Sequence, residues 1–278
     1  MVPHTKTAPN TACSNDCSVG LLDVCELQDK EFTSHLSSHE RALYMGLRNE
    51  SRKREWLAGR LSAKYLFLNR LDLPHVTQSQ QWRPTLSKLS LEALGVYSPW
   101  MYQKVEVLPN GGMPSLVWCG KDRPESISLS HAGGFSCASI ALGATTAIDL
   151  ETAVPRNDAF YTNNFSEAEI NWAARRADGE SISSSWSFTL LWTLKESALK
   201  LGWLNHASLW NLPRIEIDGL PRLDHIGRVL CSSTMDEDFV VFTARVKDPR
   251  RVMKVRVAVT GTRNLVLTVM NPLIGAIN

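Results

Sequence analysis

Residues 146–151 read Thr146-Ala147-Ile148-Asp149-Leu150-Glu151, an apolar run that ends in two carboxylates one residue apart. The run predicts a buried β-strand. Side chains alternate between the two faces of a strand, so Asp149 and Glu151 lie on the same face. Like charges on one face repel each other, and burying either charge is costly. A divalent cation such as Mg²⁺, which prefers carboxylate oxygens, would relieve both costs, so the pattern predicts a metal site.

The composition is that of a globular protein long enough to bury a substantial core. The 278 residues are 44% hydrophobic and 21% charged, and the formal net charge is +2. This charge indicates no particular partner, so electrostatic recognition must come from local patches. The basic residues 48–54 come without a nucleic-acid-binding motif, and we therefore expect no nucleic-acid partner.

Cysteine usage and hydropathy indicate a cytoplasmic protein. The six cysteines include no C-x₂-C pair, so we expect no zinc site. Residues 1–20 lack the apolar core of a signal peptide, and no stretch reaches the roughly 18 apolar residues of a membrane span. We expect reduced thiols, mostly buried or inert, and no membrane partner.

The chain divides into a tail and two halves with similar parts. Residues 1–18 are polar and predict a disordered tail. Residues 19–143 form the predicted N-terminal α+β half, and residues 144–278 the C-terminal α+β half, with the boundary near Gly143. In each half, helices precede a series of strands.

Local patterns predict the elements of the N-terminal half. A strand is expected over 20–27, and the capping box Ser37-x-x-Glu40 predicts a helix start. Longer helices are expected over 51–71 and over 86–94, the second ended by Gly95. A hairpin is expected over 105–118 and a strand over 126–130, whereas 135–142 fits either a buried strand or a short helix.

The C-terminal half begins with the predicted strand at 146–151. A second capping box, Ser166-x-x-Glu169, predicts a helix that runs to about residue 177. The clearest helix pattern covers 186–201. Strands are expected at 214–217, 228–233, 238–246, 254–259 and 264–270.

Trp192, Glu196 and Lys200 are spaced by four residues and share one face of the helix at 186–201. As an exposed helical ion pair, Glu196 and Lys200 would contribute about 0.3–0.5 kcal/mol. The alternative is that Trp192 turns this face toward protein. Glu196 would then be partly desolvated, and the metal at Asp149 and Glu151 would be its partner.

Two further features fit an anionic ligand. The helix at 51–71 and the residues before it carry a basic cluster of Arg48, Arg52, Lys53, Arg54, Arg60 and Lys64. This cluster is either a solvated face or an anion site, in which Arg60 and Lys64 clamp a phosphate. His131 follows Ser130 and precedes two glycines, and it is either structural or a phosphate ligand. Taken together with the carboxylates, these features predict a diphosphate substrate bridged by Mg²⁺. Walker A and kinase glycine motifs are absent from the sequence.

Four segments, in order, resemble motifs of the 4′-phosphopantetheinyl transferases of the long, surfactin/enterobactin type. They are EWLAGRLSA at 55–63, SLSH at 128–131, AIDLE at 147–151 and WTLKESALK at 192–200. The corresponding family motifs are A-G-R-x-x-A, S-x-S-H, G-[IV]-D-[IL]-E and W-[ST]-x-K-E-[SA]-x-x-K. The last two, with FSEAE at 165–169 between them, are highly specific. The resemblance covers residues 41–200.

The resemblance implies a fold, ligands and a reaction. The fold would be two similar α+β halves related by pseudo-two-fold symmetry, with the active-site cleft between them. The ligands would be coenzyme A and Mg²⁺ or Mn²⁺. The enzyme would transfer the phosphopantetheine arm to a serine of an apo acyl or peptidyl carrier protein and release 3′,5′-ADP. Such enzymes serve secondary-metabolite, siderophore or polyunsaturated fatty-acid synthases, and we expect a monomer.

The resemblance also implies roles for individual residues. Asp149, Glu151 and Glu196 would hold the metal, and Glu196 or a metal-ordered water would take the serine proton. Lys200 would neutralise the diphosphate and protonate the leaving phosphate. The other coenzyme contacts implied by the motifs are Ser130, His131 and Lys195 at the phosphates and Arg54 and Arg60 at the nucleotide end, including its 3′-phosphate.

Two departures from the family pattern stand out. Ala147 replaces the usual glycine, and the family's G-K-P segment reads Gly112-Met113-Pro114, which removes a lysine. The alternative function is therefore a catalytically inactive coenzyme A- or carrier-binding protein of the same fold. The presence of all three carboxylates favours the active enzyme.

Carrier proteins are usually acidic near their serine, so basic residues are candidate contacts by charge, namely Lys121, Arg123, Arg175 and Arg176.

Overall fold

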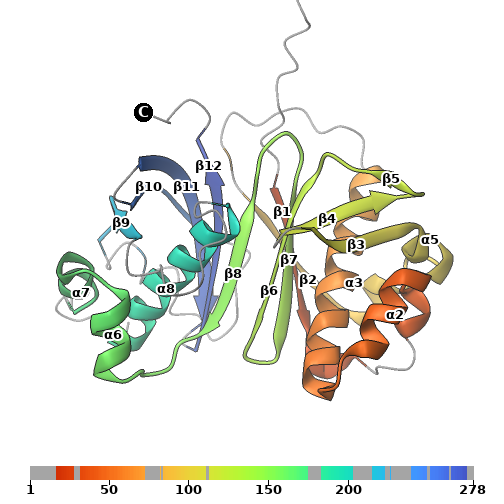
Figure 1. Ribbon diagram of the computed structural model, residues 1–278, viewed down its shortest axis with the longest axis horizontal. Coiled ribbons are helices and arrows are strands. Elements are labelled where there is room, and N and C mark those ends of the chain that lie inside the picture. The colour runs from red at the N-terminus through yellow and green to blue at the C-terminus, as the bar shows by residue number, and fades with distance from the viewer. Residues whose placement is uncertain are drawn as a thin grey trace, which may run out of the picture.

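Two β-sheets meet edge to edge at the centre of the molecule, and each carries a long helix on one face (Figure 1). The computed structural model describes residues 17–27, 32–72, 82, 84–110, 113–174, 183–202, 215–222, 226, 239–248, 251–262 and 264–273. Helices combined with one mixed and two antiparallel sheets make it an α+β fold, as the sequence predicts.

The N-terminal sheet has the strand order β2-β1-β7-β6. Its strands are β1 (Cys17–Asp23), β2 (Thr85–Leu89), β6 (Ser126–Ala132) and β7 (Phe135–Ala141). Helix α3 (Glu50–Asp72) packs on β1 and β7, with Leu57, Leu61 and Phe67 in the core. A second, smaller sheet contains β3 (Val105–Asn110), β4 (Met113–Trp118) and β5 (Lys121–Asp122). Its short neighbours are α2 (Ser38–Gly46), α4 (Leu91–Leu94) and α5 (Pro99–Lys104), with 3₁₀ turns at Val24–Glu26 and Thr33–His35.

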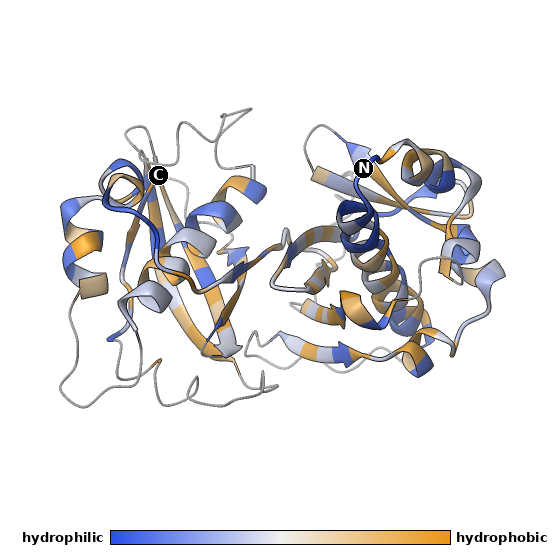
Figure 2. Ribbon diagram, turned by 90° about the horizontal axis from the view of Figure 1, so that it is seen from below, coloured by the Kyte–Doolittle hydropathy of each residue, from blue (hydrophilic) through white to orange (hydrophobic). Residues whose placement is uncertain are grey.

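The C-terminal sheet has the order β8-β12-β11-β10-β9. Its strands are β8 (Ala147–Thr152), β9 (Glu216–Asp218), β10 (Val240–Asp248), β11 (Arg251–Thr262) and β12 (Leu265–Pro272). Helix α8 (Ser184–Lys200) packs on β8 and β12, while α6 (Asp158–Asn164) and α7 (Glu167–Ala174) lie outside it. The strands of both halves carry much of the hydrophobic colour in Figure 2.

Serine hydroxyls join the two sheets where their edge strands β6 and β8 run side by side (Figure 1). The backbone amides of Thr146, Ile148 and Leu150 donate to the hydroxyls of Ser126, Ser128 and Ser130, over 3.0, 3.1 and 3.2 Å. Residue numbers rise together along the two strands, so the strands run in the same direction. The serine hydroxyls thus accept hydrogen bonds from backbone amides at the edge of the sheet, which would otherwise need the carbonyls of a neighbouring strand.

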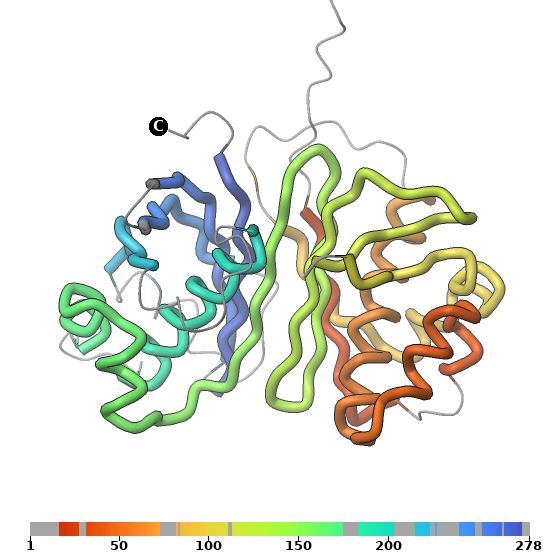
Figure 3. The backbone as a smooth tube through the Cα atoms, in the orientation of Figure 1, coloured from red at the N-terminus to blue at the C-terminus, as the bar shows by residue number. Residues whose placement is uncertain are grey.

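An apolar cluster continues the joint on the other side of β8. Ile148 and Leu150 are buried there against Val19 and Leu21 of β1 and Leu267 of β12. Because side chains alternate along β8, Asp149 and Glu151 point away from this cluster. One short connection, residues 142–146, leads the chain from β7 to β8, and Figure 3 shows it at the top of the joint.

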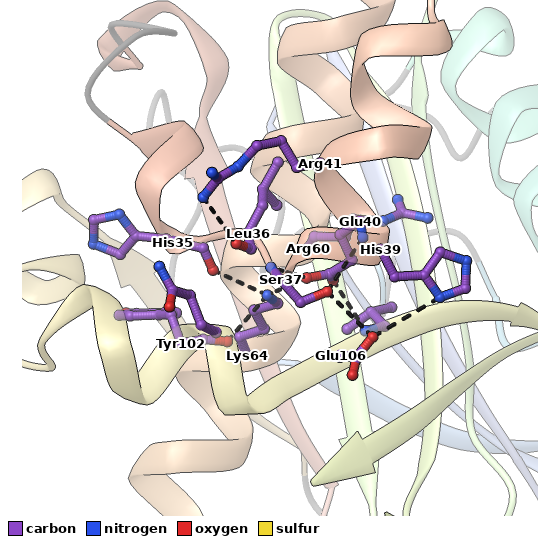
Figure 4. A network of polar contacts seen from close by, with 12 residues as sticks. His35, Leu36, Ser37, His39, Glu40, Arg41, Arg60, Lys64, Tyr102 and Glu106 are labelled. Carbon is purple, nitrogen blue, oxygen red and sulfur yellow. Dashed lines mark hydrogen bonds and ion pairs between the residues drawn. The ribbon is translucent and has the colours of Figure 1, made fainter. Parts of the chain in front are cut away.

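The two halves repeat one buried contact almost atom for atom. In the N-terminal half, Glu40 completes the capping box of α2, pairs with the buried Lys64, and accepts from the amide of Val107 over 3.0 Å (Figure 4). In the C-terminal half, Glu169 closes the box on Ser166 at the start of α7. It pairs with Lys195 over 2.8 Å and accepts from the amide of Ile217 over 2.9 Å.

Each lysine of this contact also donates to a backbone carbonyl at an equivalent position. Lys64 donates to the carbonyl of His35 over 3.1 Å, and Lys195 donates to that of Asn164 over 2.6 Å. Each carbonyl lies two residues before the serine of its capping box. This repetition supports the expected pseudo-two-fold relation, which itself stays a prediction.

The prediction of a helix over 86–94 is wrong. Residues 85–89 form β2, which pairs in parallel with β1, and only the single turn α4 is helical. Leu86 and Leu89 are buried in the sheet, so tertiary pairing overrides the local pattern. The predicted tail is also too long, because Cys17 and Ser18 belong to β1, and its residues 1–16 lie outside the described part of the chain.

The other predicted elements agree with the structure to within a few residues. Both capping boxes are confirmed, as are the hairpin of β3 and β4 and the helix α8. The ambiguous segment at 135–142 is the strand β7. The expected strand at 228–233 and the end of the helix expected to reach 177 lie outside the described residues.

Thiols and helix lengths bear on two further expectations. Among the described cysteines, Cys17 and Cys137 are buried and Cys25 and Cys119 are exposed. In the described ranges, no helix combines the length and the apolar character that crossing a membrane requires.

Candidate active site

Asp149 is the centre of a polar cluster at the joint between the sheets. Its side chain is 6% exposed, and Oδ1 accepts from the ammonium of Lys200 over 2.7 Å and from the hydroxyl of Ser130 over 2.8 Å. The other oxygen, Oδ2, is buried and has no hydrogen-bond partner among the described residues. A buried carboxylate oxygen without a donor is costly, so this atom is suited to a cation or an incoming donor.

Lys200 links the two halves. Besides Asp149, its ammonium donates to the carbonyl of Ile148 in β8 over 3.0 Å and to that of Leu129 in β6 over 3.3 Å. All three donor positions of the ammonium are thereby used. The expected alternative, a surface pair between Glu196 and Lys200 along α8, is replaced by this tertiary contact.

Glu196 and Glu151 complete a group of three carboxylates. Burial raises the pKa of Glu196 to about 7, and the charges of Asp149 and then Glu151 add to the shift against the opposing effect of Lys200. Burial and the charge of Asp149 also raise the pKa of Glu151, although Arg156 lies 3.6 Å from it. The charge of Asp149 therefore makes both Glu151 and Glu196 harder to ionise, as expected for ligands of a hard cation.

The assignment of Asp149, Glu151 and Glu196 to one metal site stays a prediction. Within the described ranges, no cluster of three His, Cys, Asp or Glu side chains has the arrangement of a metal site. The reason lies in their present partners, because Ser130 and Lys200 occupy one oxygen of Asp149 and Arg156 attracts Glu151. The donor set nevertheless fits Mg²⁺ in chemistry, through hard oxygens, excess negative charge and the unpartnered Oδ2.

His131 lies near the carboxylates, with α3 on its other side. Its ring contacts the guanidinium of Arg52 and lies 3.2 Å from the carboxylate of Glu55. Burial, followed by the charge of Arg52, lowers the pKa of His131. The imidazole is therefore neutral at neutral pH and offers a hydrogen bond, while Arg52 supplies the positive charge.

Arg60 lies on α3, eight residues after Arg52, and is almost completely buried. Its guanidinium lies 3.3 Å from the ring centroid of Trp56, and its Nε has no partner among the described residues. Burial lowers the pKa of Arg60 to about 10, with Glu40 opposing and Arg52 adding to the shift. A desolvated guanidinium gains from an anion, which fits the expected phosphate contact. Arg54, two residues from Arg52, lies on a different face of α3, and its coenzyme contact stays a prediction.

Two lysines do not face the site. Lys64 is fully buried against Glu40, so the phosphate clamp of Arg60 and Lys64 is wrong. Lys195 is equally buried, and its ammonium binds Glu169 and the carbonyl of Asn164. With no exposed surface, Lys195 has no path to a coenzyme phosphate in this conformation, in contrast to the role that the motif implies.

The structure adds residues that the sequence interpretation did not select. Arg52 and Glu55 flank His131. In the sequence, Arg52 could be noticed only as part of the basic cluster, and Glu55 only as the first residue of the segment at 55–63. Ser126 and Ser128 join the sheets, and their alternation with Ser130 was the available signal. Of the basic candidates for carrier contact, Lys121 is exposed, whereas Arg123 is paired with Glu125 over 2.8 Å. Arg175 and Arg176 lie outside the described residues.

Solved structures of known proteins resemble this chain in fold. The fold is similar to the holo-[acyl-carrier-protein] synthase (AcpS) of Thermotoga maritima, with a TM-score of 0.31 and 21% sequence identity. The match covers 54% of this chain and 74% of that chain. No protein-family model and no curated protein matches the sequence.

Proposed function

We propose that this protein transfers the 4′-phosphopantetheine arm of coenzyme A to a serine of an apo acyl or peptidyl carrier protein. The observation that carries the proposal is the group of Asp149, Glu151 and Glu196 beside Lys200 at the joint between the halves. These residues belong to the two most specific motifs of the resemblance. Three carboxylates beside the ammonium of Lys200 suit a metal-bound diphosphate.

Asp149, Glu151 and Glu196 are the residues that would hold Mg²⁺ or Mn²⁺. When bound, the ion would neutralise the diphosphate and stabilise the leaving phosphate. The unpartnered Oδ2 of Asp149 and the raised pKa of Glu196 support this assignment, because a cation favours the ionised form of both groups.

The protein groups account for the proton and the charges of the transfer. The serine oxygen attacks the β-phosphorus, and the bond from that phosphorus to the bridging oxygen breaks, which releases 3′,5′-ADP. Glu196, or a water ordered by the metal, would take the serine proton. Lys200 supplies a positive charge beside Asp149 for the diphosphate, and Arg52, His131 and Arg60 supply donors for the other phosphates.

One observation favours the alternative, a non-catalytic coenzyme A- or carrier-binding protein. The lysine of the family's G-K-P segment is missing from Gly112-Met113-Pro114, which removes one cation from the expected coenzyme site. A protein that binds coenzyme A without turnover would need Arg60 and His131 but not Glu196.

Mass spectrometry of a carrier protein distinguishes the two functions. The protein is mixed with coenzyme A, Mg²⁺ and one of several apo acyl or peptidyl carrier proteins. We expect the carrier to gain the mass of phosphopantetheine, and Asp149→Asn to lose this activity while keeping its fold. Glu167→Gln, on the exposed side of α7, is the matched control and should remain active. Coenzyme A binding without modification of any carrier would support the non-catalytic alternative.

A further inference from the structure

Ser130 differs from the other two serines of the joint. Ser126, Ser128 and Ser130 each accept one backbone amide from residues 146–150, which is a structural role. The hydroxyl of Ser130 alone has a second contact across the joint, because it also donates to Oδ1 of Asp149 over 2.8 Å. Ser130 is 8% exposed and Asp149 is 4% exposed, so both groups are shielded from water.

A serine hydroxyl has only one hydrogen to donate. In Ser130 that hydrogen is committed to Asp149, while the amide of Leu150 occupies an acceptor position. A phosphate oxygen requires a donor and would therefore have to displace Asp149. The expected contact between Ser130 and a coenzyme phosphate competes with a charge-assisted hydrogen bond that already exists.

The two oxygens of Asp149 consequently have different environments. Oδ1 has two donors, Ser130 and Lys200, on opposite sides of the joint, and Oδ2 has none among the described residues. We infer that Ser130 is a positioning residue, which fixes the carboxylate of Asp149 so that Oδ2 is left for a divalent cation. This inference rests on the proposed function, because it assigns Asp149 a metal to hold.

Ser128 provides a matched control for this role. Ser128→Ala removes one hydroxyl-to-amide contact of the joint, as Ser130→Ala does, but leaves the bond to Asp149 intact. Ser130→Thr keeps the hydroxyl. Three measurements are made on the full chain and on each variant: the urea unfolding midpoint, Mn²⁺ affinity by electron paramagnetic resonance, and coenzyme A affinity by calorimetry in EDTA.

We expect Ser130→Ala to weaken Mn²⁺ binding about 10- to 100-fold, the usual effect of losing a partner of a metal ligand. Ser128→Ala should bind Mn²⁺ as the wild type does, and Ser130→Thr should recover most of the affinity. Coenzyme A affinity in EDTA should be unchanged in all three variants. The unfolding midpoint should fall further in Ser130→Ala than in Ser128→Ala, because Ser130→Ala also removes the hydrogen bond to the buried Asp149.

Two results would overturn the inference. Mn²⁺ affinity that falls equally in Ser128→Ala and Ser130→Ala would reduce Ser130 to a structural residue. Weakened coenzyme A binding in EDTA with unchanged Mn²⁺ affinity would make Ser130 a phosphate ligand. Failure of the proposed function is separately visible, since the wild type would then leave every carrier unmodified.

Discussion

The ammonium of Lys200 lies 2.7 Å from Oδ1 of Asp149 and also binds one carbonyl from each sheet edge, those of Leu129 and Ile148. A single side chain from α8 thus neutralises the buried carboxylate and holds the two halves together. The site and the joint share the same residues, so changes that weaken one should be detectable in the other.

Replacing Lys200 by methionine should destabilise the protein. Asp149 would remain buried without its cation, and the two carbonyls would lose a donor, at a cost of about 2–3 kcal/mol. Mg²⁺ should restore part of this loss if it binds Asp149. Urea unfolding with and without Mg²⁺ measures both effects. Lys88→Met, on the exposed side of β2, is the control and should show neither; equal losses in both variants would contradict the prediction.

Glu196 should make the metal-free protein less stable as the pH rises. Its pKa is raised from 4.5 to about 7 by burial and by Asp149, so the folded state binds this proton more tightly than the unfolded chain does. The free energy of unfolding therefore falls as the pH rises through this window.

The variant Glu196→Gln lacks this titration. In EDTA, its stability relative to the wild type should rise between about pH 4.5 and pH 7 by about 1–2 kcal/mol, and then level off. Unfolding curves across this pH range provide the measurement, with Glu167→Gln as the control. Parallel pH profiles for the wild type and Glu196→Gln would show that Glu196 keeps an ordinary pKa.

Lys195 should act on stability rather than on coenzyme binding. Lys195→Met leaves Glu169 charged and buried, which costs about 3–5 kcal/mol. The double variant with Glu169→Gln should recover much of this loss, and Lys64→Met should behave like Lys195→Met because it breaks the equivalent contact. Urea unfolding of the wild type and of these three variants measures the changes in the free energy of unfolding. A Lys195→Met variant of normal stability but with a raised KM for coenzyme A would instead support the role implied by the motif.

Arg60 should contribute to coenzyme binding through the 3′-phosphate. Its guanidinium is stacked on Trp56 and partly desolvated, so a phosphate contact should be strong. Arg60→Ala should raise KM for coenzyme A about 10- to 100-fold, which corresponds to about 1.4–2.7 kcal/mol, and change kcat little. With 3′-dephospho-coenzyme A as substrate, the wild type and the variant should have similar KM values. A difference in KM that persists with this substrate would show that Arg60 contacts another part of the coenzyme.

Local sequence patterns were sufficient for much of the fold. The apolar run that ends in two carboxylates identified β8 with Asp149 and Glu151 on one face, and the serine-to-glutamate spacing identified the starts of α2 and α7. Both patterns depend on residues within a few positions of one another, where side-chain direction follows from backbone geometry. The helix expected at 86–94 failed because pairing with β1, about 67 residues away in sequence, decides the strand β2.

The sequence by itself determined which residues carry charge and on which face of their own element they lie. Only the tertiary structure decided their partners. It directed Lys195 and Lys64 into buried contacts with capping glutamates, Lys200 to Asp149, and Ser130 to the same carboxylate. The physical reason is that a hydrogen bond or ion pair depends on a few ångströms of separation, which long-range packing sets and residue spacing alone does not.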